Sequence, residues 1–265
     1  MPYRYAVCLG GIAWREMLRF LHQRERFVAA LVRPLVWLFV FAAGFRHVLD
    51  LPITPPYQTY IPYEAYIVPG LIAMVQLFNG MQSSLSMVYD REMGNMRILL
   101  VSPFPRGYLL VCKLLASTAV SIPQVYAFLL ISRLYGIDAP AWGYLAVLPA
   151  LILNGLMLGA LGMLLSSLVK QLENFAGIMN FVIFPMFFAS SALTPLLLVE
   201  RSSPLLSLVC RLNPLTYGIE LIRFALYVQV NWLALAAVCG SAGVFTAAAV
   251  LAYDPARGLI GHRGA

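Results

Sequence analysis

Residues 88–113 read VYDREMGNMRILLVSPFPRGYLLVCK, a charged segment between two apolar runs of membrane length. The segment holds four cations and two acids in a chain that is otherwise strongly apolar. Residues 90–101 are compatible with a helix, and Pro103 and Pro105 follow them and stop it. The pattern predicts a short charged helix over 90–101 that connects two membrane spans and is placed to dock against another protein.

The composition defines the class of protein. Of the 265 residues, 61% are hydrophobic and 11% are charged, and the mean hydropathy is +0.82. Soluble domains carry about 25% charged residues. We therefore expect an all-α integral membrane protein with one transmembrane domain over 1–265 and little room for a separate soluble domain.

Apolar runs of about 20 residues predict six spanning helices. They cover residues 27–48, 65–88, 109–135, 142–168, 175–193 and 230–253. With these spans, twelve of the eighteen Lys and Arg residues fall on the side that holds both termini. The positive-inside rule makes this side the cytoplasm. We expect a multi-pass protein of the bacterial inner (plasma) membrane, embedded in the lipid bilayer, whose net charge of +7 reflects topology and indicates no nucleic-acid partner.

Residues 11–26, before the first span, have the periodicity of an amphipathic helix. Trp14, Met17 and Leu18 fall on one face, and Arg15 and Arg19 fall on the other. The pattern predicts an interfacial helix in the plane of the membrane surface, and a solvated cytoplasmic helix is the alternative. Within the first span, Arg33 is expected near the cytoplasmic end, where its long side chain can reach the interface.

Two predicted spans carry polar residues at helical spacing. These residues are Gln76, Asn79, Ser83 and Ser86 in the second span and Ser117, Ser121 and Gln124 in the third. Polar groups inside a bilayer must face protein or water. The two stripes therefore either line a translocation path between two copies of the chain or form hydrogen bonds between helices. The fourth span carries a ridge of small residues, Gly155, Gly159, Gly162 and Ser166, which predicts a close approach by a neighbouring helix.

The outer connection over 194–229 is more apolar than a solvated loop. Prolines divide it into two short helices, over 203–211 and 215–227. We expect a re-entrant helical hairpin packed against protein. Arg211, Asn213 and Pro214, at its break, are the predicted outer gate, and an apolar cap without a gating role is the alternative.

Several kinds of active site are absent from this sequence. No Gly-rich loop ends in Gly-Lys-Ser or Gly-Lys-Thr, so the sequence has no phosphate-binding loop for ATP. No zinc-protease helix or hydrolase nucleophile turn occurs, and the four cysteines have no metal-ligand spacing. We expect no metal site, no bound cofactor and no catalytic residue. A membrane anchor that recruits a cytoplasmic complex and a lipid-modifying membrane enzyme remain as alternatives to a transporter.

Four local patterns resemble the permease subunits of type-2 ABC exporters, the ABC-2 family. They are VPGLIAM at 68–74, DREMGNMRILLVSP at 90–103, KLLA at 113–116 and RLNPLTY at 211–217. The second is similar to the family's Arg-Glu-x-Gly-Thr-x-x-x-Leu-x-x-x-Pro segment, with Asn95 at the Thr position. The resemblance extends over almost the whole chain.

The resemblance implies a half-transporter that exports an amphiphile such as a drug, a lipid or a glycan conjugate. A second permease copy, identical or a paralogue, would complete the pathway, and a separate ABC ATPase subunit would hold ATP and magnesium. The interfacial helix and the cytoplasmic coupling helix over 90–101 would receive the motion of the ATPase. The coupling residues implied are Asp90, Arg91, Glu92, Met93, Met96, Arg97 and Leu100.

Overall fold

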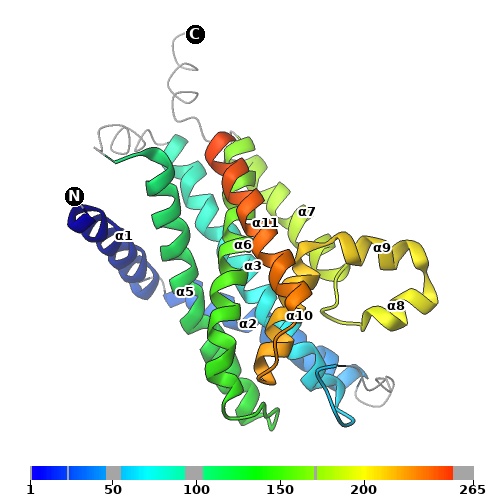
Figure 1. Ribbon diagram of the computed structural model, residues 1–265. Helices are drawn as coiled ribbons and strands as arrows, with labels where there is room; N and C mark the ends of the chain where they lie inside the picture. Colours follow the sequence, from blue (N-terminus) through cyan, green and yellow to red (C-terminus); the bar gives the residue numbers. More distant parts are fainter. Residues whose placement is uncertain (1, 23, 46–54, 93–103, 170–171, 253–265) are drawn as a thin grey trace.

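The structure is a computed structural model that describes residues 2–22, 24–45, 55–92, 104–169 and 172–252. These residues form helices and turns and contain no strand (Figure 1). The helices are α1 (Pro2–His22), α2 (Arg24–Phe45), α3 (Tyr63–Glu92), α5 (Arg106–Leu134), α6 (Gly143–Leu168), α7 (Leu172–Phe188), α8 (Leu196–Ser202), α9 (Pro204–Leu212), α10 (Pro214–Leu226) and α11 (Trp232–Ala252). The all-α prediction is confirmed.

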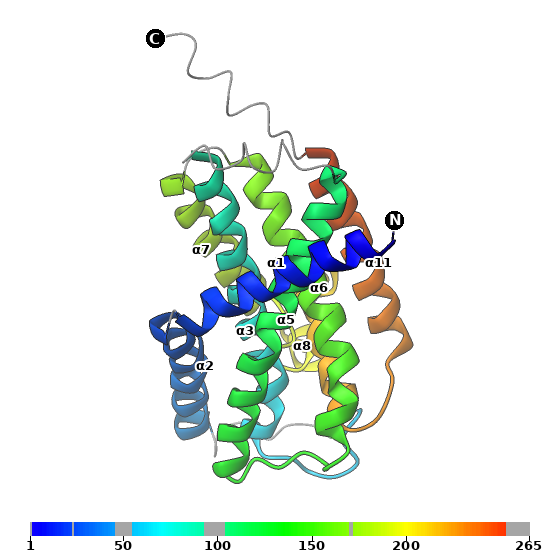
Figure 2. The same cartoon turned by 90° about the vertical axis from the view of Figure 1, so that its left-hand side faces the viewer.

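The long helices form a bundle around α3. In Figure 1, α3, α6 and α11 end at the upper end of the bundle, where α5 and α7 begin. Helix α1 lies across the bundle axis instead, as Figure 2 shows. The hydroxyl of Tyr108 in α5 donates to the Tyr5 carbonyl in α1 at 2.6 Å, and the Tyr5 ring meets the Tyr108 ring edge-on at 4.9 Å. This crosswise orientation is the one an interfacial helix requires.

Three helical segments of the described residues are long and apolar enough to cross a membrane: Gly107–Leu134, Gly143–Leu168 and Trp232–Ala252. The bent pair α9 and α10 makes a fourth if the two are counted as one span. Helix α3 is long enough, but Gln76, Asn79 and Gln82 lower its hydropathy, and α7 has only 17 residues. The six spans therefore stay a prediction.

Two helix boundaries differ from those predicted. The predicted helix over 11–26 is in the structure α1, which begins at Pro2 and ends at His22. A proline suits the first turn of a helix, where no N–H partner is required. Helix α7 ends at Phe188 rather than at 193. Ser190 stops it, because its hydroxyl donates to the Phe187 carbonyl at 2.6 Å and accepts from the Ala192 N–H at 3.2 Å.

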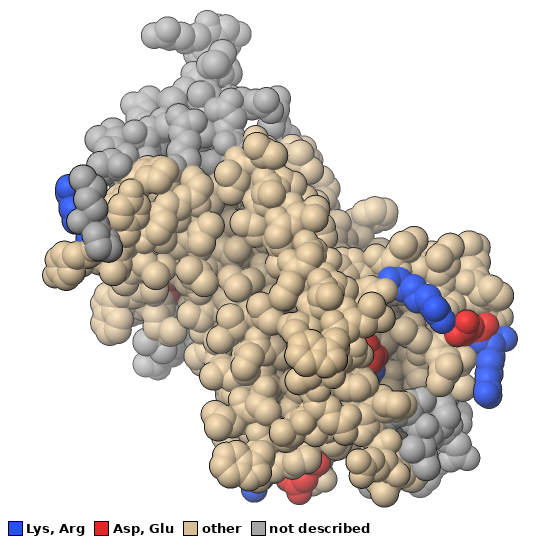
Figure 3. Space-filling view, viewed as in Figure 1, with Lys and Arg blue, Asp and Glu red and all other residues tan. Residues whose placement is uncertain are grey.

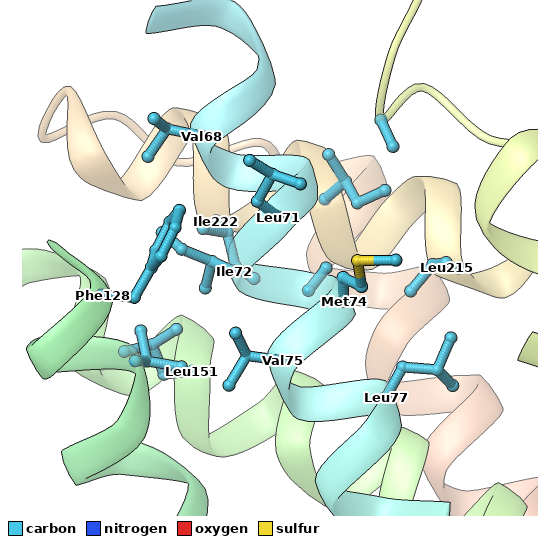
Figure 4. Packing of buried hydrophobic residues seen from close by; sticks show 14 of the residues in the cluster. Val68, Leu71, Ile72, Met74, Val75, Leu77, Phe128, Leu151, Leu215 and Ile222 are labelled. Carbon is cyan, nitrogen blue, oxygen red and sulfur yellow. The ribbon is translucent and has the colours of Figure 1, made fainter. Parts of the chain in front are cut away.

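The core surrounds α3 on all sides. Leu71, Met74 and Leu77 of α3 are fully buried. Figure 4 shows this helix between Phe128 of α5 and Leu215 of α10, with side chains of α6 completing the cluster. A helix that is apolar around most of its circumference belongs in a protein interior. Helix α3 is therefore the central element of the fold.

The ridge of small residues on α6 packs against α3 and α5. A Cβ atom on Gly162 would lie 2.8 Å from the Gly80 carbonyl oxygen of α3 and 2.6 Å from the Ser84 hydroxyl. A Cβ on Gly80 would in turn lie 3.1 Å from the Gly159 Cα. The α3 and α6 backbones are thus in direct contact, and only glycine permits this approach.

We predict that Gly162→Ala destabilises the protein by about 1 to 3 kcal/mol, because the new methyl group must push the α3 backbone away. Gly240→Ala in α11 is the matched control, since nothing lies within 4 Å of its Cβ position. Thermal unfolding of both purified variants in detergent measures the difference. An unfolding temperature of Gly162→Ala at or above that of the parent protein would contradict the packing described.

Candidate functional site

Three buried polar side chains from three helices meet in the centre of the bundle, and we name them the amide junction: Gln76 of α3, Ser121 of α5 and Asn154 of α6. Gln76 Nε2 donates to the Leu151 carbonyl at 2.7 Å and to Ser121 Oγ at 3.4 Å. Asn154 Nδ2 donates to Gln76 Oε1 at 2.7 Å. Gln76 and Asn154 are 1% and 0% exposed. In lipid, such bonds stabilise helix contacts because the alternative is an unpaired polar group.

The rest of the polar stripe continues along α3 and α5. Asn79 Nδ2 donates to the Ser117 carbonyl at 2.9 Å, and both residues are buried. Gln124 is buried as well. Ser83 and Ser86 are half-buried, and the Ser86 hydroxyl donates to the Ser83 carbonyl within α3 at 2.7 Å. Within one chain Gln76 and Asn79 of α3 therefore make contacts with α5, and a role of the stripe in lining a path stays a prediction.

Asn154 was not among the residues predicted from sequence. It extends the junction toward the outer hairpin, because a Cβ on Gly218 of α10 would overlap its Oδ1 atom. The glycine thus lets α10 lie directly against the amide. A single Asn within an otherwise apolar span was the feature of the sequence that could have revealed it.

A second polar cluster joins α10 to α3, and we name it the arginine cluster: Arg223, Glu220, Tyr66 and Ser191. The Arg223 guanidinium is 2% exposed, forms an ion pair with Glu220, and lies 4.1 Å from the centre of the Tyr66 ring. Arg223 Nη2 and the Tyr66 hydroxyl both donate to the Ser191 carbonyl, at 2.9 Å and 3.1 Å. Nearby, burial raises the pKa of Tyr57 to about 12, with the charge of Arg223 opposing the shift.

The arginine cluster was also missed from sequence, where Arg223 counted only as an outer cation. The spacing of Glu220 and Arg223, three residues apart on a helix, indicated an ion pair. This spacing did not indicate that Arg223 is buried. The cluster connects α10 to the centre of the fold through a cation, an aromatic ring and a carbonyl.

Asn213 forms the break between α9 and α10, which are bent by 77°. Its Oδ1 accepts from the Leu215 N–H at 3.0 Å and caps α10, whose first residue is Pro214. Its Nδ2 donates to the carbonyls of Met186 and Ala189 at 2.6 Å, so the same side chain also satisfies the end of α7. The predicted gate residues Asn213 and Pro214 thus lie at the bend between α9 and α10, and their role as a gate stays a prediction.

Arg211, the third predicted gate residue, lies on the surface and not at the hinge contacts. It donates to Glu200 of α8 at 2.9 Å, and both side chains are half exposed. Figure 3 shows charged atoms gathered over α8 and α9, while most of the described surface on this face is uncharged. Helix α8 was not predicted.

The predicted coupling residues are only partly described. Asp90, Arg91 and Glu92 form the last turn of α3, which runs without interruption from Tyr63. The predicted boundary at 88 is therefore not a break in the helix. Met93, Met96, Arg97 and Leu100 lie outside the described residues.

The described part of the chain contains no group of three His, Cys, Asp or Glu side chains that could hold a metal ion. The cysteines Cys8, Cys112, Cys210 and Cys239 are unpaired. The polar clusters of this structure form contacts between helices.

Most of the chain is similar in sequence to known proteins. The family described as ABC-2 type transporter matches residues 9–227. A protein of Cyanophora paradoxa named as a transport permease, ycf38, is 30% identical over 209 residues, which cover 78% of this chain and 69% of that protein. A protein of Escherichia coli K12 named as a multidrug ABC transporter permease, YbhR, is 29% identical over 177 residues, 66% of this chain and 47% of that protein. Nodulation protein J of Rhizobium leguminosarum bv. viciae is 24% identical over 269 residues, 96% of each chain.

We predict that Gln76→Leu and Asn154→Leu each destabilise the protein by about 1 to 3 kcal/mol, because each leaves a buried amide unpaired. The loss in free energy of unfolding of the double variant should be smaller than the sum of the two single losses, by about 0.5 kcal/mol or more. Unfolding by SDS in mixed micelles measures the free energies. Gln76→Leu combined with Ser86→Ala is the additive control, since the two positions lie about 15 Å apart along α3. If the losses of Gln76→Leu and Asn154→Leu in free energy of unfolding were additive, the hydrogen bond between these two residues would be refuted.

We predict that Arg223→Met destabilises the hairpin by about 3 to 5 kcal/mol, because it leaves the Glu220 carboxylate without its buried partner. Arg211→Met breaks the exposed ion pair with Glu200 in the same hairpin and should cost at most about 1 kcal/mol. The same SDS titration compares them. Equal losses in the two variants would show that the arginine cluster is not a buried contact.

Proposed function

Because this chain belongs to the ABC-2 type transporter family, we propose that it is the permease subunit of an exporter that moves an amphiphile out of the cytoplasm. A permease of this family is the membrane component of an ABC transporter and is not itself catalytic. The sequence holds no phosphate-binding loop, so a separate ABC ATPase subunit binds ATP and magnesium and performs the hydrolysis. The amphiphile is a drug, a lipid or a glycan conjugate.

The proposed topology has six spans, with both termini in the cytoplasm of a bacterium. The alternating directions of α3, α5, α6, α7 and α11 support it (Figure 1). The cation-rich ends then face the cytoplasm, and α1 lies in the interface on that side. A second copy of the chain, or a paralogue, completes the pathway.

The observation that carries the proposal is the unbroken α3. One helix connects the charged turn of Asp90, Arg91 and Glu92 with the core and with Tyr66 of the arginine cluster. A push from an ATPase at the charged end of α3 therefore reaches the outer part of the fold through one continuous helix. No flexible loop interrupts this path within α3.

Helix α6 follows α3 because the two backbones touch at Gly80 and Gly162 and the amide junction binds them. The contact of Asn154 with Gly218 carries the displacement to α10. Asn213 then lets α10 turn relative to α9, which opens the outer side. The polar stripe becomes available to substrate when the helices part.

We predict that Glu92→Gln combined with Arg97→Gln uncouples the transporter. Loss of both charges removes the charged contacts to the ATPase, so ATP-driven export should fall at least about tenfold while membrane insertion is unchanged. The measurement is ATP-dependent efflux from vesicles that contain the permease together with its ATPase.

Arg133→Gln combined with Asp138→Asn is the matched control. It removes one positive and one negative charge from an exposed ion pair, Arg133 Nε to Asp138 Oδ1 at 3.6 Å, at the opposite end of the bundle. This variant should leave efflux unchanged. Full efflux in the Glu92 and Arg97 variant would refute the coupling role.

A further inference from the structure

Arg33 of α2 contacts the central helix. Its guanidinium carbon is 3.7 Å from the centre of the Phe78 ring of α3. Phe78 follows Tyr63 by 15 residues and precedes Glu92 by 14, which is about 21 to 23 Å from either end of α3 at 1.5 Å per residue. The charge therefore lies beside the middle of the central helix, and the expectation that Arg33 reaches the cytoplasmic interface stays a prediction.

The guanidinium has no anionic partner in the part of the chain that the structure describes. Its one recorded contact there is the face of the Phe78 ring. The side chain is half-buried. Burying a charge is costly, and a cation–π contact offsets only part of this cost. The five N–H donors of the group are suited to a carboxylate, sulfate or phosphate.

Aromatic rings lie along the seam between α2 and α7, which we define by Arg33, Trp37, Phe41, Phe184 and Phe188. Trp37 stacks on Phe41 at 5.3 Å and meets Phe188 edge-on at 6.0 Å. Phe184 meets Phe78 edge-on at 6.5 Å. Figure 2 shows α2 and α7 on the same side of the bundle.

The seam is open in the single chain. Phe184 and Phe188 are 39% and 51% exposed, and Val36 on α2 is 53% exposed. A cation with unused donors next to exposed rings is complementary to a molecule that has an anionic head and an apolar body. An uncharged amphiphile, or a cationic one, would leave the guanidinium without a partner.

We propose that the seam binds the transported amphiphile, with Arg33 holding its anionic group and the rings of α2 and α7 holding its apolar part. The substrates are then anionic amphiphiles. This rests on the proposed export function and narrows it to one chemical class. Arg33 is a specificity-determining residue that contacts the substrate, and Phe78 positions it.

The test is binding to the full-length permease, without ATPase, in phosphatidylcholine nanodiscs. The probes are a fluorescent twelve-carbon carboxylate and its uncharged amide, so that only the charge of the head differs. The parent protein should bind the carboxylate at least about tenfold more tightly than the amide. Arg33→Gln should reduce this ratio to about one, and Arg33→Lys should retain part of it.

Arg133→Gln is the control, because it removes an exposed cation at the outer end of α5 and should leave the ratio unchanged. The ratio is measured on folded protein, so a lower yield of Arg33→Gln does not affect it. Equal affinities for the two probes in the parent protein, or a preference that survives in Arg33→Gln, would overturn the proposal.

Two further arms separate the possible occupants. Phosphatidylglycerol added to the nanodiscs offers the same anionic chemistry from a resident lipid. If it displaces the carboxylate, and vesicles with ATPase do not export the probe, the seam is a lipid site and the proposal is overturned. If the preference for the carboxylate over the amide is lost when two permease copies pair, the second chain covers the seam. This outcome also overturns the proposal. Absence of ATP-driven export of any amphiphile, with the binding preference intact, would contradict the export function alone.

Discussion

The contact between the backbones of α3 and α6 is the constraint on which the rest of the structure depends. Two helices in lipid gain little from burying apolar side chains, because the lipid is equally apolar. Close packing and hydrogen bonds must hold them together instead. Gly80 and Gly162 bring the two backbones into contact, and this approach places Gln76 within reach of Asn154. The other helices pack around this pair.

The polar contacts of the middle part of α10 give this helix a defined position on that pair. Asn154 lies against Gly218, and Arg223 bonds to Ser191 beside Tyr66. Each of these two polar side chains is costly to bury alone and is stabilised only when its partners are in place. Such contacts favour one arrangement over intermediate ones, which suits an element that changes between two positions. In the proposed mechanism, Asn213, which bonds to α10 and to the end of α7, is the point where the change is absorbed.

Much of this was predictable from sequence, for reasons that depend on local patterns. The spacing of Gly155, Gly159 and Gly162 predicted a close helix contact, and the structure has one. Asn213 and Pro214 predicted a break, and the bend lies there. The contact of Arg33 with Phe78 and the burial of Arg223 were not predictable, because both depend on which residues of other helices lie opposite. The start of α1 was missed because Gly10 and Gly11 interrupt the pattern.

The central claim is that α3 and α6 move as one body that displaces the hairpin. Electron–electron double resonance tests it in the complex with ATPase, in nanodiscs, with the native cysteines replaced and labelled chains diluted with unlabelled ones. Spin labels at the exposed positions Tyr89 of α3, Leu145 of α6 and Leu205 of α9 report the two distances. The account predicts that the distance from Tyr89 to Leu145 stays constant between the nucleotide-free and ATP-trapped states, while that from Tyr89 to Leu205 changes. A change between Tyr89 and Leu145 as large as that between Tyr89 and Leu205 would contradict it.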